Sequence, residues 1–283
     1  MSSPPPVVER TQPWLGTLVA IRVTGADPSL ANRAIDAAFA EIAAIHDLMS
    51  FHQPASDLSR LNRHGAATEV RLDPRTAEVL AFALDLARRS DGAFDPAIAS
   101  RAVANGDLPA PAGASPPDPE GSWRDVVLDG TEARLLRPVW LDLGGVAKGY
   151  AVDRAVDQLR DHGVEQACVN AGGDLRVLGD EPELVRLRAG DDDHMPVIEI
   201  SDGALASSGG DVAGLSLTRC YAAGRPIPVL RFASVAAPKC MAADALTKVV
   251  LAGIATIDLL GAYGARAWIF EPADGWRSLG EAA

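Results

Sequence analysis

The sequence lacks the segments that would direct a protein into or across a membrane. It has no apolar run that approaches the roughly 18 residues needed to span a bilayer. Its first residues, Met1 to Pro6, contain neither the basic region nor the apolar core of a signal peptide, and no early cysteine offers a site for a lipid. We therefore expect a cytoplasmic protein without membrane insertion.

Cysteine and histidine are also scarce. The three cysteines, Cys168, Cys220 and Cys240, are far apart and odd in number, so they match neither a zinc spacing nor a disulfide framework. We expect all three to be small buried residues. The five histidines include no H-x-x-x-H pair, which argues against a metal site built from histidine.

Basic side chains are outnumbered by acidic ones, 26 to 38, which gives a net charge of -12. A surface of this charge repels phosphate backbones and anionic lipids, so we expect no nucleic-acid partner. An anionic ligand would have to be held locally by backbone N–H groups, by a lysine or arginine, or by a metal. The apolar fraction of 48% is that of an ordinary globular protein.

The pattern of apolar residues predicts helices and strands in mixed order. We expect helices over 28–49, after Pro74, over 147–162 and from Ala243, a short turn after Ser56, strands over 17–23, 125–129, 134–136, 139–143, 166–170, 174–178, 184–188, 196–200, 204–206 and 229–236, and a hairpin over 257–277. Because these elements alternate without a regular βα rhythm, the predicted class is α+β (mixed α/β). We treat residues 1–13 as a Pro-rich leader and 14–283 as a single domain. Residues 105–122, with five prolines and three glycines, are predicted to be a surface excursion.

Two glycine-rich turns are candidates for binding an anion. Gly144 and Gly145 lie between a predicted strand and a helix that has Lys148 in its first turn. The glycines let a ligand approach the backbone, the helix N-terminus offers unpaired N–H groups, and Lys148 adds a full charge. The order of a P-loop is missing, and a tight turn with a solvated lysine accounts for the same residues. Gly172 and Gly173 form a second such turn, for which a simple hairpin is also sufficient.

Asp244 has two possible roles at the start of the helix expected from Ala243. Its carboxylate can cap that helix, or it can hold a divalent cation against phosphates. Lys248 follows one turn later, so the two side chains share a helix face.

Seven motifs, taken in order, resemble those of the ApbE family of FAD:protein FMN transferases, formerly called thiamine-biosynthesis lipoproteins. They are Leu15–Thr17, Ser50–Asn62, Ser90–Pro96, Asp142–Asp153, Asn170–Asp174, Ser207–Gly209 and Ala242–Leu246. The resemblance implies an ApbE-like α+β fold with a flavin site between the two glycine-rich turns and the helical N-terminal part. It also implies a Mg²⁺-dependent reaction that splits FAD at its pyrophosphate, passes FMN to a Thr or Ser of a target flavoprotein, and releases AMP.

The resemblance assigns roles to individual residues. The implied FAD-binding residues are Phe51, Ser56, Asp57, Asn62, Asp142, Gly144, Gly145, Lys148, Asn170, Gly172, Gly173 and Ser208. The implied metal ligands are the Ala147 carbonyl, Asp244 and Thr247, and the catalytic pair is Asp244 with Lys248. Magnesium suits such a site because it prefers hard oxygen donors and offsets charge on a reacting phosphate. For Phe51, stacking beside the isoalloxazine ring and simple packing in the core both remain open.

The sequence departs from the family at two places. The family has a metal-binding Thr four residues after the Asp, where this chain has Lys248, and Thr247 points about 100° away on an ideal helix. The family's H-x-x-D-P-x-T-G segment corresponds to residues 217–224, where Leu217 and Cys220 replace the His and the Asp.

These departures lead to a specific expectation for Lys248. We predict that its ammonium lies beside Asp244, at the family's metal position, so that FAD binding tolerates EDTA while transfer or hydrolysis is slow or absent. In the alternative, Lys248 reaches solvent and Thr247 ligates the metal.

The sequence therefore indicates three alternative functions. The first is an FAD:protein FMN transferase, the second an FAD-binding paralogue that acts as a flavin carrier or assembly factor, and the third a Mg²⁺-dependent FAD pyrophosphatase.

Overall fold

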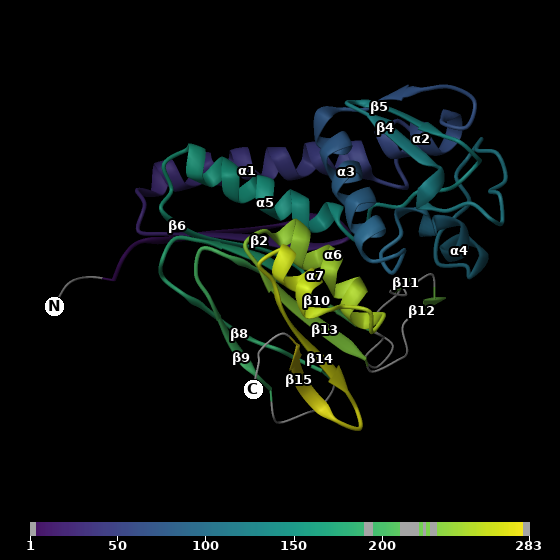
Figure 1. The fold of residues 1–283 in the computed structure, drawn as a ribbon. Helices are drawn as coiled ribbons and strands as arrows, with labels where there is room; N and C mark the ends of the chain where they lie inside the picture. Colours follow the sequence, from purple (N-terminus) through teal and green to yellow (C-terminus); the bar gives the residue numbers. More distant parts are fainter. Residues whose placement is uncertain (1–3, 190–194, 210–220, 223–224, 227–230, 280–283) are drawn as a thin grey trace.

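An eight-stranded antiparallel sheet forms the centre of the molecule (Figure 1). The computed structural model describes residues 4–189, 195–209, 221–222, 225–226 and 231–279. In their order across the sheet, the strands are β1 (Val7–Trp14), β2 (Thr17–Thr24), β6 (Gln166–Ala171), β7 (Asp174–Leu178), β10 (Ala204–Gly209), β13 (Phe232–Ala237), β14 (Arg266–Glu271) and β15 (Gly275–Leu279).

Helices and small sheets surround this central sheet. The helices are α1 (Pro28–Met49), α2 (Asp57–His64), α3 (Pro74–Arg89), α4 (Ala99–Ala104), α5 (Ala147–Asp161), α6 (Cys240–Leu251) and α7 (Ile257–Ala262), with 3-10 turns at Pro96–Ile98 and Trp123–Asp125. The small sheets are β3 (Val70–Arg71), β5 (Glu132–Leu135) and β4 (Val126–Asp129); β8 (Glu183–Arg186) with β9 (Val197–Ile200); and β11 (Tyr221–Ala222) with β12 (Arg225–Pro226). The predicted α+β class is confirmed. Within the described ranges, no helix is both long and apolar enough to span a membrane.

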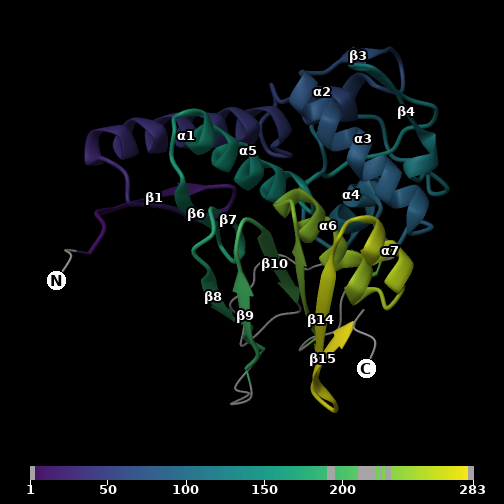
Figure 2. The ribbon, with the colours of Figure 1, turned by 60° about the vertical axis from the view of Figure 1, so that its left-hand side comes forward.

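The two faces of the sheet are covered by different elements. Helices α1, α5 and α6 lie on one face and the β8–β9 hairpin lies on the other, as Figures 1 and 2 show from two sides. Strand β7 illustrates the alternation, since successive side chains of a strand point to opposite faces. Arg176 bonds to α5, whereas Leu175 and Val177 pack with the inner residues of β8 and β9. All five residues of β7 are therefore buried.

Helix caps explain why several elements begin where the sequence predicts. Asp27 accepts hydrogen bonds from the N–H groups of Ser29 and Leu30 at 3.0 and 3.1 Å, directly before Pro28 at the start of α1. Ser56 accepts one from Ser59 N at 3.0 Å and so begins α2. Helices α1, α3 and α5 and most of the expected strands are confirmed.

The segment 139–143 is not the predicted strand. Its apolar residues are buried, but its backbone groups bond outside any sheet. The Asn62 side chain accepts from Leu141 N at 2.7 Å and donates to Leu141 O at 2.9 Å, and Asp142 N donates to Pro96 O at 2.9 Å. A short apolar run does not by itself reveal which partners its backbone will find.

Three element boundaries also differ from the expectation. Residues 7–14, assigned mostly to the leader, form β1 and pair with β2, and Pro13 is tolerated there because β1 is an edge strand. The first part of the expected 257–277 hairpin is α7, capped by the Thr256 side chain, which accepts from Leu259 N at 3.1 Å. Helix α6 begins at Cys240 instead of Ala243. The departures at Leu217 and Cys220, within 217–224, fall among residues that lie outside the described ranges.

Candidate functional site

The turn at Gly144 and Gly145 leads directly into the N-terminus of α5. Gly144 N donates to Asp142 Oδ1 at 3.0 Å, which shapes the turn. The N-cap residue of α5, Val146, provides no side-chain acceptor for the first N–H groups of the helix. A Cβ atom on Gly145 would lie 3.4 Å from Lys248 Cε, so this turn contacts the lysine of α6. The glycine turn, a helix N-terminus and a cation thus lie together.

Gly149 allows α5 and α6 to approach each other very closely. A Cβ atom there would lie 2.7 Å from Cys240 C, 2.9 Å from Asp244 Cβ, and closer still to Cys240 O. In the structure Gly149 N instead donates to Asp244 Oδ2 at 3.1 Å, which places a carboxylate at the N-terminus of α5. The expectation that Asp244 caps its own helix is wrong, because α6 begins four residues earlier.

Helix α5 likewise supplies a carboxylate, that of Asp153, to the N-terminus of α6. Asp153 accepts hydrogen bonds from Cys240 N and Met241 N, both at 2.9 Å, and pairs with Arg176 at 3.0 Å. Each helix therefore supplies a carboxylate to the N-terminus of the other. Asp153 and Arg176 were not predicted from the sequence as site residues, although a charge in the middle of the apolar strand β7 indicates that a buried partner exists.

Two lysine–carboxylate pairs lie at this helix crossing. Lys148 Nζ pairs with Asp174 Oδ2, and Lys248 Nζ lies 2.5 Å from Asp244 Oδ1. Both carboxylates have side chains only 1% exposed. Burial and then the nearby Asp244 charge raise the pKa of Asp174 to about 6, despite the opposing effect of the two lysines. Burial acts to lower the pKa of Lys148, but the Asp174 and Asp244 carboxylates outweigh it and raise that pKa.

Lys248 is surrounded by oxygen atoms. Besides Asp244 Oδ1, its Nζ donates to the backbone oxygen of Asp244 at 3.0 Å and to Ser208 Oγ at 3.1 Å. Thr247 Oγ1 donates to the same Asp244 oxygen at 2.6 Å and lies 2.8 Å from Ser208 Oγ, within hydrogen-bond distance. The Lys248 side chain is 13% exposed, so it lies beside Asp244 as the helical spacing predicts and does not extend into solvent.

The second glycine-rich turn is a hairpin turn that lies close to the first. Asn170 Oδ1 accepts from Gly173 N at 2.9 Å, and Gly172 and Gly173 have φ values of +64° and +105°, which favour glycine. This geometry agrees with the structural explanation of the motif. The Lys148–Asp174 pair joins the start of β7, directly after this turn, to the N-terminus of α5.

Three predicted FAD-binding residues use their side chains inside the protein. Ser56 caps α2, Asp57 Oδ2 accepts from Asp73 N at 2.6 Å, and Asn62 holds the backbone of Leu141. All three are buried. They fix the segments around the glycine turn to one another, and these bonds leave their polar atoms occupied by the protein itself.

Phe51 lies at the edge of this region. It is half-buried and packs against the main core, as the core interpretation requires. It also lines a cavity of about 240 Å³ together with His52, Arg63 and the loop at 109–112. Both interpretations of Phe51 therefore remain compatible with its position.

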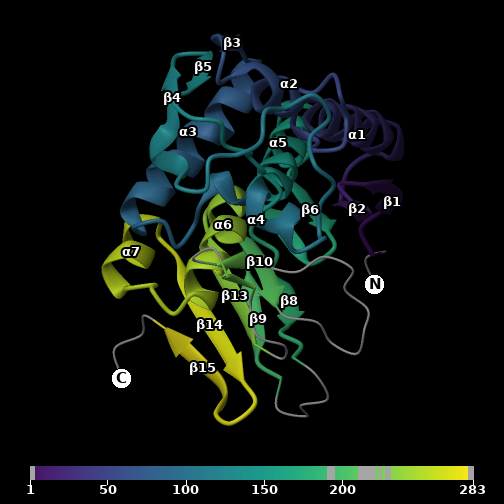
Figure 3. The same ribbon diagram turned by 90° about the vertical axis from the view of Figure 1, so that its right-hand side faces the viewer.

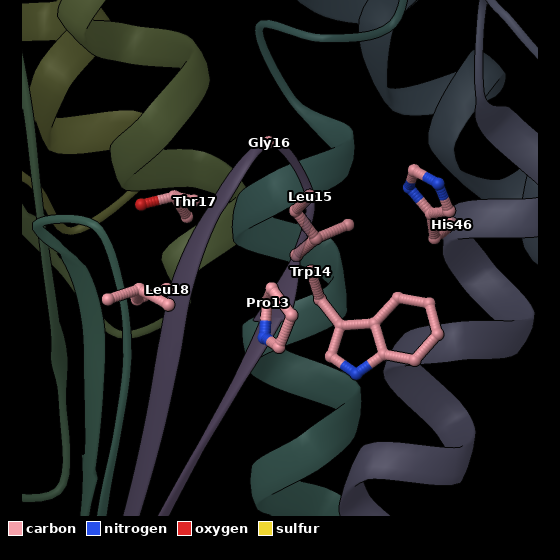
Figure 4. Close-up of a pocket in the computed structure, with 7 residues that line it drawn as sticks. All are labelled: Pro13, Trp14, Leu15, Gly16, Thr17, Leu18 and His46. Carbon is pink, nitrogen blue, oxygen red and sulfur yellow. The ribbon is translucent and has the colours of Figure 1, made fainter.

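A larger hollow of about 640 Å³ lies at the β1–β2 turn (Figure 4). It is lined by Pro13, Trp14, Leu15, Gly16, Thr17, Leu18 and His46. A Cβ atom on Gly172 would lie 3.0 Å from Thr17 Cβ, so this turn touches the second glycine-rich turn. The rings of Trp14 and His46 have centroids 5.9 Å apart. Leu15–Thr17 was recognised from the sequence only as a family motif, and Trp14 and His46 were not predicted as site residues.

The predicted metal ligands lie on the two helices that cross, α5 and α6. Ala147 is the first residue of α5, and Asp244 and Thr247 lie on α6. Seen from the side, α6 runs between α5 and the sheet strands β10 and β13 (Figure 3). In the described part of the chain, no group of three or more His, Cys, Asp and Glu side chains is arranged to hold a metal ion.

Comparison with known proteins gives a consistent result. The model of the ApbE family matches residues 15–259. The FAD:protein FMN transferase of Rhodobacter capsulatus is 34% identical over 191 residues, 64% of this chain and 36% of that protein, and the transferase of Vibrio cholerae is 28% identical over 181 residues, 58% of this chain and 54% of that protein. These alignments thus span about a third to a half of the relatives.

Solved structures extend the similarity of fold to nearly the whole chain. The ApbE protein of Thermotoga maritima has a TM-score of 0.81 at 24% identity, and the flavin transferase ApbE of Vibrio cholerae has 0.78 at 23% identity. Each comparison covers 97% of both chains. The family match over residues 15–259 shows that the chain belongs to the ApbE family.

Proposed function

We propose that this protein is an FAD:protein FMN transferase. It splits FAD at the pyrophosphate, passes FMN to a Thr or Ser hydroxyl of a target flavoprotein, and releases AMP. The observation that carries the proposal is the position of Lys148 and Lys248, beside a glycine turn and the N-terminus of α5, in a protein of net charge -12. The names of the relatives support the same activity.

The site has the features that a diphosphate requires. Gly144 and Gly145 would let the phosphates approach the backbone at the positive end of the α5 dipole. Two of the first N–H groups of α5 are already bonded, Ala147 N to Leu143 O and Gly149 N to Asp244 Oδ2, so the attraction would come mainly from the dipole and from the lysines. Lys148 has its ammonium paired with Asp174, which holds it at this end of the helix. These groups would bind and orient the pyrophosphate of FAD. The hollow beside Thr17 and Trp14 is a candidate for one of the ring systems, because it is next to the second glycine turn.

The resemblance to the ApbE family implies a magnesium ion. The oxygen atoms of the implied ligands Asp244 and Thr247 are already bonded within the protein and do not form an open metal site. Asp244 Oδ1 is paired with Lys248 and Asp244 Oδ2 accepts from Gly149 N. Thr247 Oγ1 donates to the backbone oxygen of Asp244 and is hydrogen-bonded to the Ser208 hydroxyl. A metal ion would have to displace these contacts, so no step of the reaction is assigned to it here.

The occupied oxygens favour a second candidate function, an FAD-binding paralogue that carries flavin without transferring it. Incubation of the purified protein with FAD, with and without an apo-flavoprotein acceptor, separates the candidates. AMP release together with a fluorescent flavin band on the acceptor supports the transferase. AMP with free FMN in the absence of acceptor indicates an FAD pyrophosphatase, and intact bound FAD indicates the carrier. Absence of FAD binding would contradict all three.

A further inference from the structure

We propose that the ammonium of Lys248 is a built-in cation that takes the place of a divalent metal ion, so that this site binds its ligand without metal. The identity of the ligand, FAD, rests on the proposed function. The placement of the cation rests on the contacts of α6 alone.

The atoms around Lys248 Nζ are the kind that a divalent cation would use. They include a carboxylate oxygen and a backbone carbonyl oxygen of Asp244, at 2.5 and 3.0 Å, and the hydroxyl oxygen of Ser208 at 3.1 Å. These are hard oxygen donors, which both Mg²⁺ and an ammonium group accept as neighbours. These oxygens thus form a position suited to a cation, and Lys248 fills it.

A metal ion and the ammonium cannot share this position. Mg²⁺ binds oxygen at about 2.0–2.1 Å with nearly octahedral geometry. An ion bound to Asp244 Oδ1 would therefore overlap Nζ, which is 2.5 Å from the same oxygen. The other carboxylate oxygen is held by Gly149 N, so the carboxylate cannot turn to offer a free edge without breaking that bond.

Burial keeps Lys248 in place. Asp244 is 1% exposed and Lys248 is 13% exposed, and the aliphatic stem of the lysine contacts the Gly145 turn. Withdrawal of the lysine would leave a buried carboxylate without its counter-ion, which is costly. The residue type also fits the role: only three of the 26 basic residues are lysines, and a compact ammonium fits an oxygen-lined position that a planar guanidinium does not.

Lys248 would act on a bound ligand differently from a metal ion. Lys248 Nζ lies within hydrogen-bond distance of the three oxygens named above, and we expect it to act on a bound diphosphate through its charge. It neutralises Asp244, which would otherwise repel a phosphate at the N-terminus of α5. Unlike a metal ion, it cannot bind two phosphate oxygens as ligands.

Titration with Mn²⁺ alone, followed by electron paramagnetic resonance, tests the cation position without FAD. We expect no stoichiometric site in the wild type and a new site in Lys248→Thr, which frees Asp244 Oδ1 from its ion pair and places a hydroxyl four residues after Asp244. Lys239→Thr is the matched control, because Lys239 precedes the same helix and its side chain is 51% exposed. It should behave as wild type. If Lys248→Thr does not fold, Lys248→Met keeps the stem, removes the charge and should also gain Mn²⁺ binding.

FAD affinity, measured by flavin fluorescence in EDTA and in Mg²⁺, gives the second readout. For the wild type we expect affinities that agree within about twofold, and for Lys248→Thr a gain of about tenfold or more on adding Mg²⁺. Stoichiometric Mn²⁺ binding by the wild type, or a tenfold loss of its FAD affinity in EDTA, would overturn the inference. Failure of every variant to bind FAD would contradict the proposed function and leave the Mn²⁺ result as an independent test of Lys248.

Discussion

Replacement of Gly149 by alanine should destabilise the protein, although alanine is the better helix former. The added methyl group would lie 2.7 Å from Cys240 C and 2.9 Å from Asp244 Cβ. These atoms belong to a backbone and to the base of a side chain, so they cannot rotate away and α5 and α6 must separate. Such overpacking costs about 1–3 kcal/mol. Separation also breaks the bond from Gly149 N to the Asp244 carboxylate, worth about 1.5–3 kcal/mol, against a helix-propensity gain of about 1 kcal/mol.

The expected net loss of unfolding free energy is therefore about 1.5–5 kcal/mol. Urea unfolding followed by circular dichroism measures it. Gly261→Ala is the matched control, because Gly261 lies within α7 and an added Cβ would meet nothing within 4 Å. That variant should gain up to about 1 kcal/mol. A Gly149→Ala protein as stable as the wild type would refute the close helix crossing and the role assigned to Gly149.

Three further outcomes are expected. Lys148→Ala should weaken FAD binding by about 1.5–3 kcal/mol, measured by titration calorimetry. Adding Asp174→Asn removes the carboxylate that Lys148 leaves unpaired, so the double variant should recover part of the loss. An affinity of Lys148→Ala within twofold of wild type would contradict this role of Lys148. FAD affinity should rise as the pH falls through about 6, because the pKa of Asp174 is raised to about 6 and its carboxylate then loses the negative charge that repels the phosphates. Asp174→Asn should abolish this pH dependence. In Phe51→Ala, unchanged quenching of flavin fluorescence with unchanged affinity would assign Phe51 to the core; a change in quenching would assign it to the flavin.

Local signals allowed much of the fold to be predicted from the sequence. Helices α1 and α2 begin at residues whose caps, Asp27 and Ser56, are visible in the sequence, because a cap bonds to N–H groups only two or three residues away. The prediction of a strand at 139–143 was wrong because its backbone partners are distant in the sequence. Its backbone is held by Asn62, 79 residues earlier, and such a partner is invisible to a local pattern.

The same distinction applies to the candidate site. The position of Lys248 beside Asp244 was predictable because residues four apart share a helix face. Asp153 was not selected because the helix that it caps lies 87 residues further along the chain. Asp174 was named only as the last residue of the motif Asn170–Asp174, since its pairing with Lys148 depends on how β7 meets α5.

A crystal structure of the protein soaked with FAD and Mn²⁺, with data collected at the manganese absorption edge, tests the central claim most directly. We expect the FAD diphosphate beside Gly144, Gly145 and the N-terminus of α5, with Lys248 still paired to Asp244 and no anomalous peak at that carboxylate. FAD bound elsewhere would contradict the proposed site. An anomalous peak on Asp244, with Lys248 displaced from it, would contradict the role of Lys248 as the built-in cation.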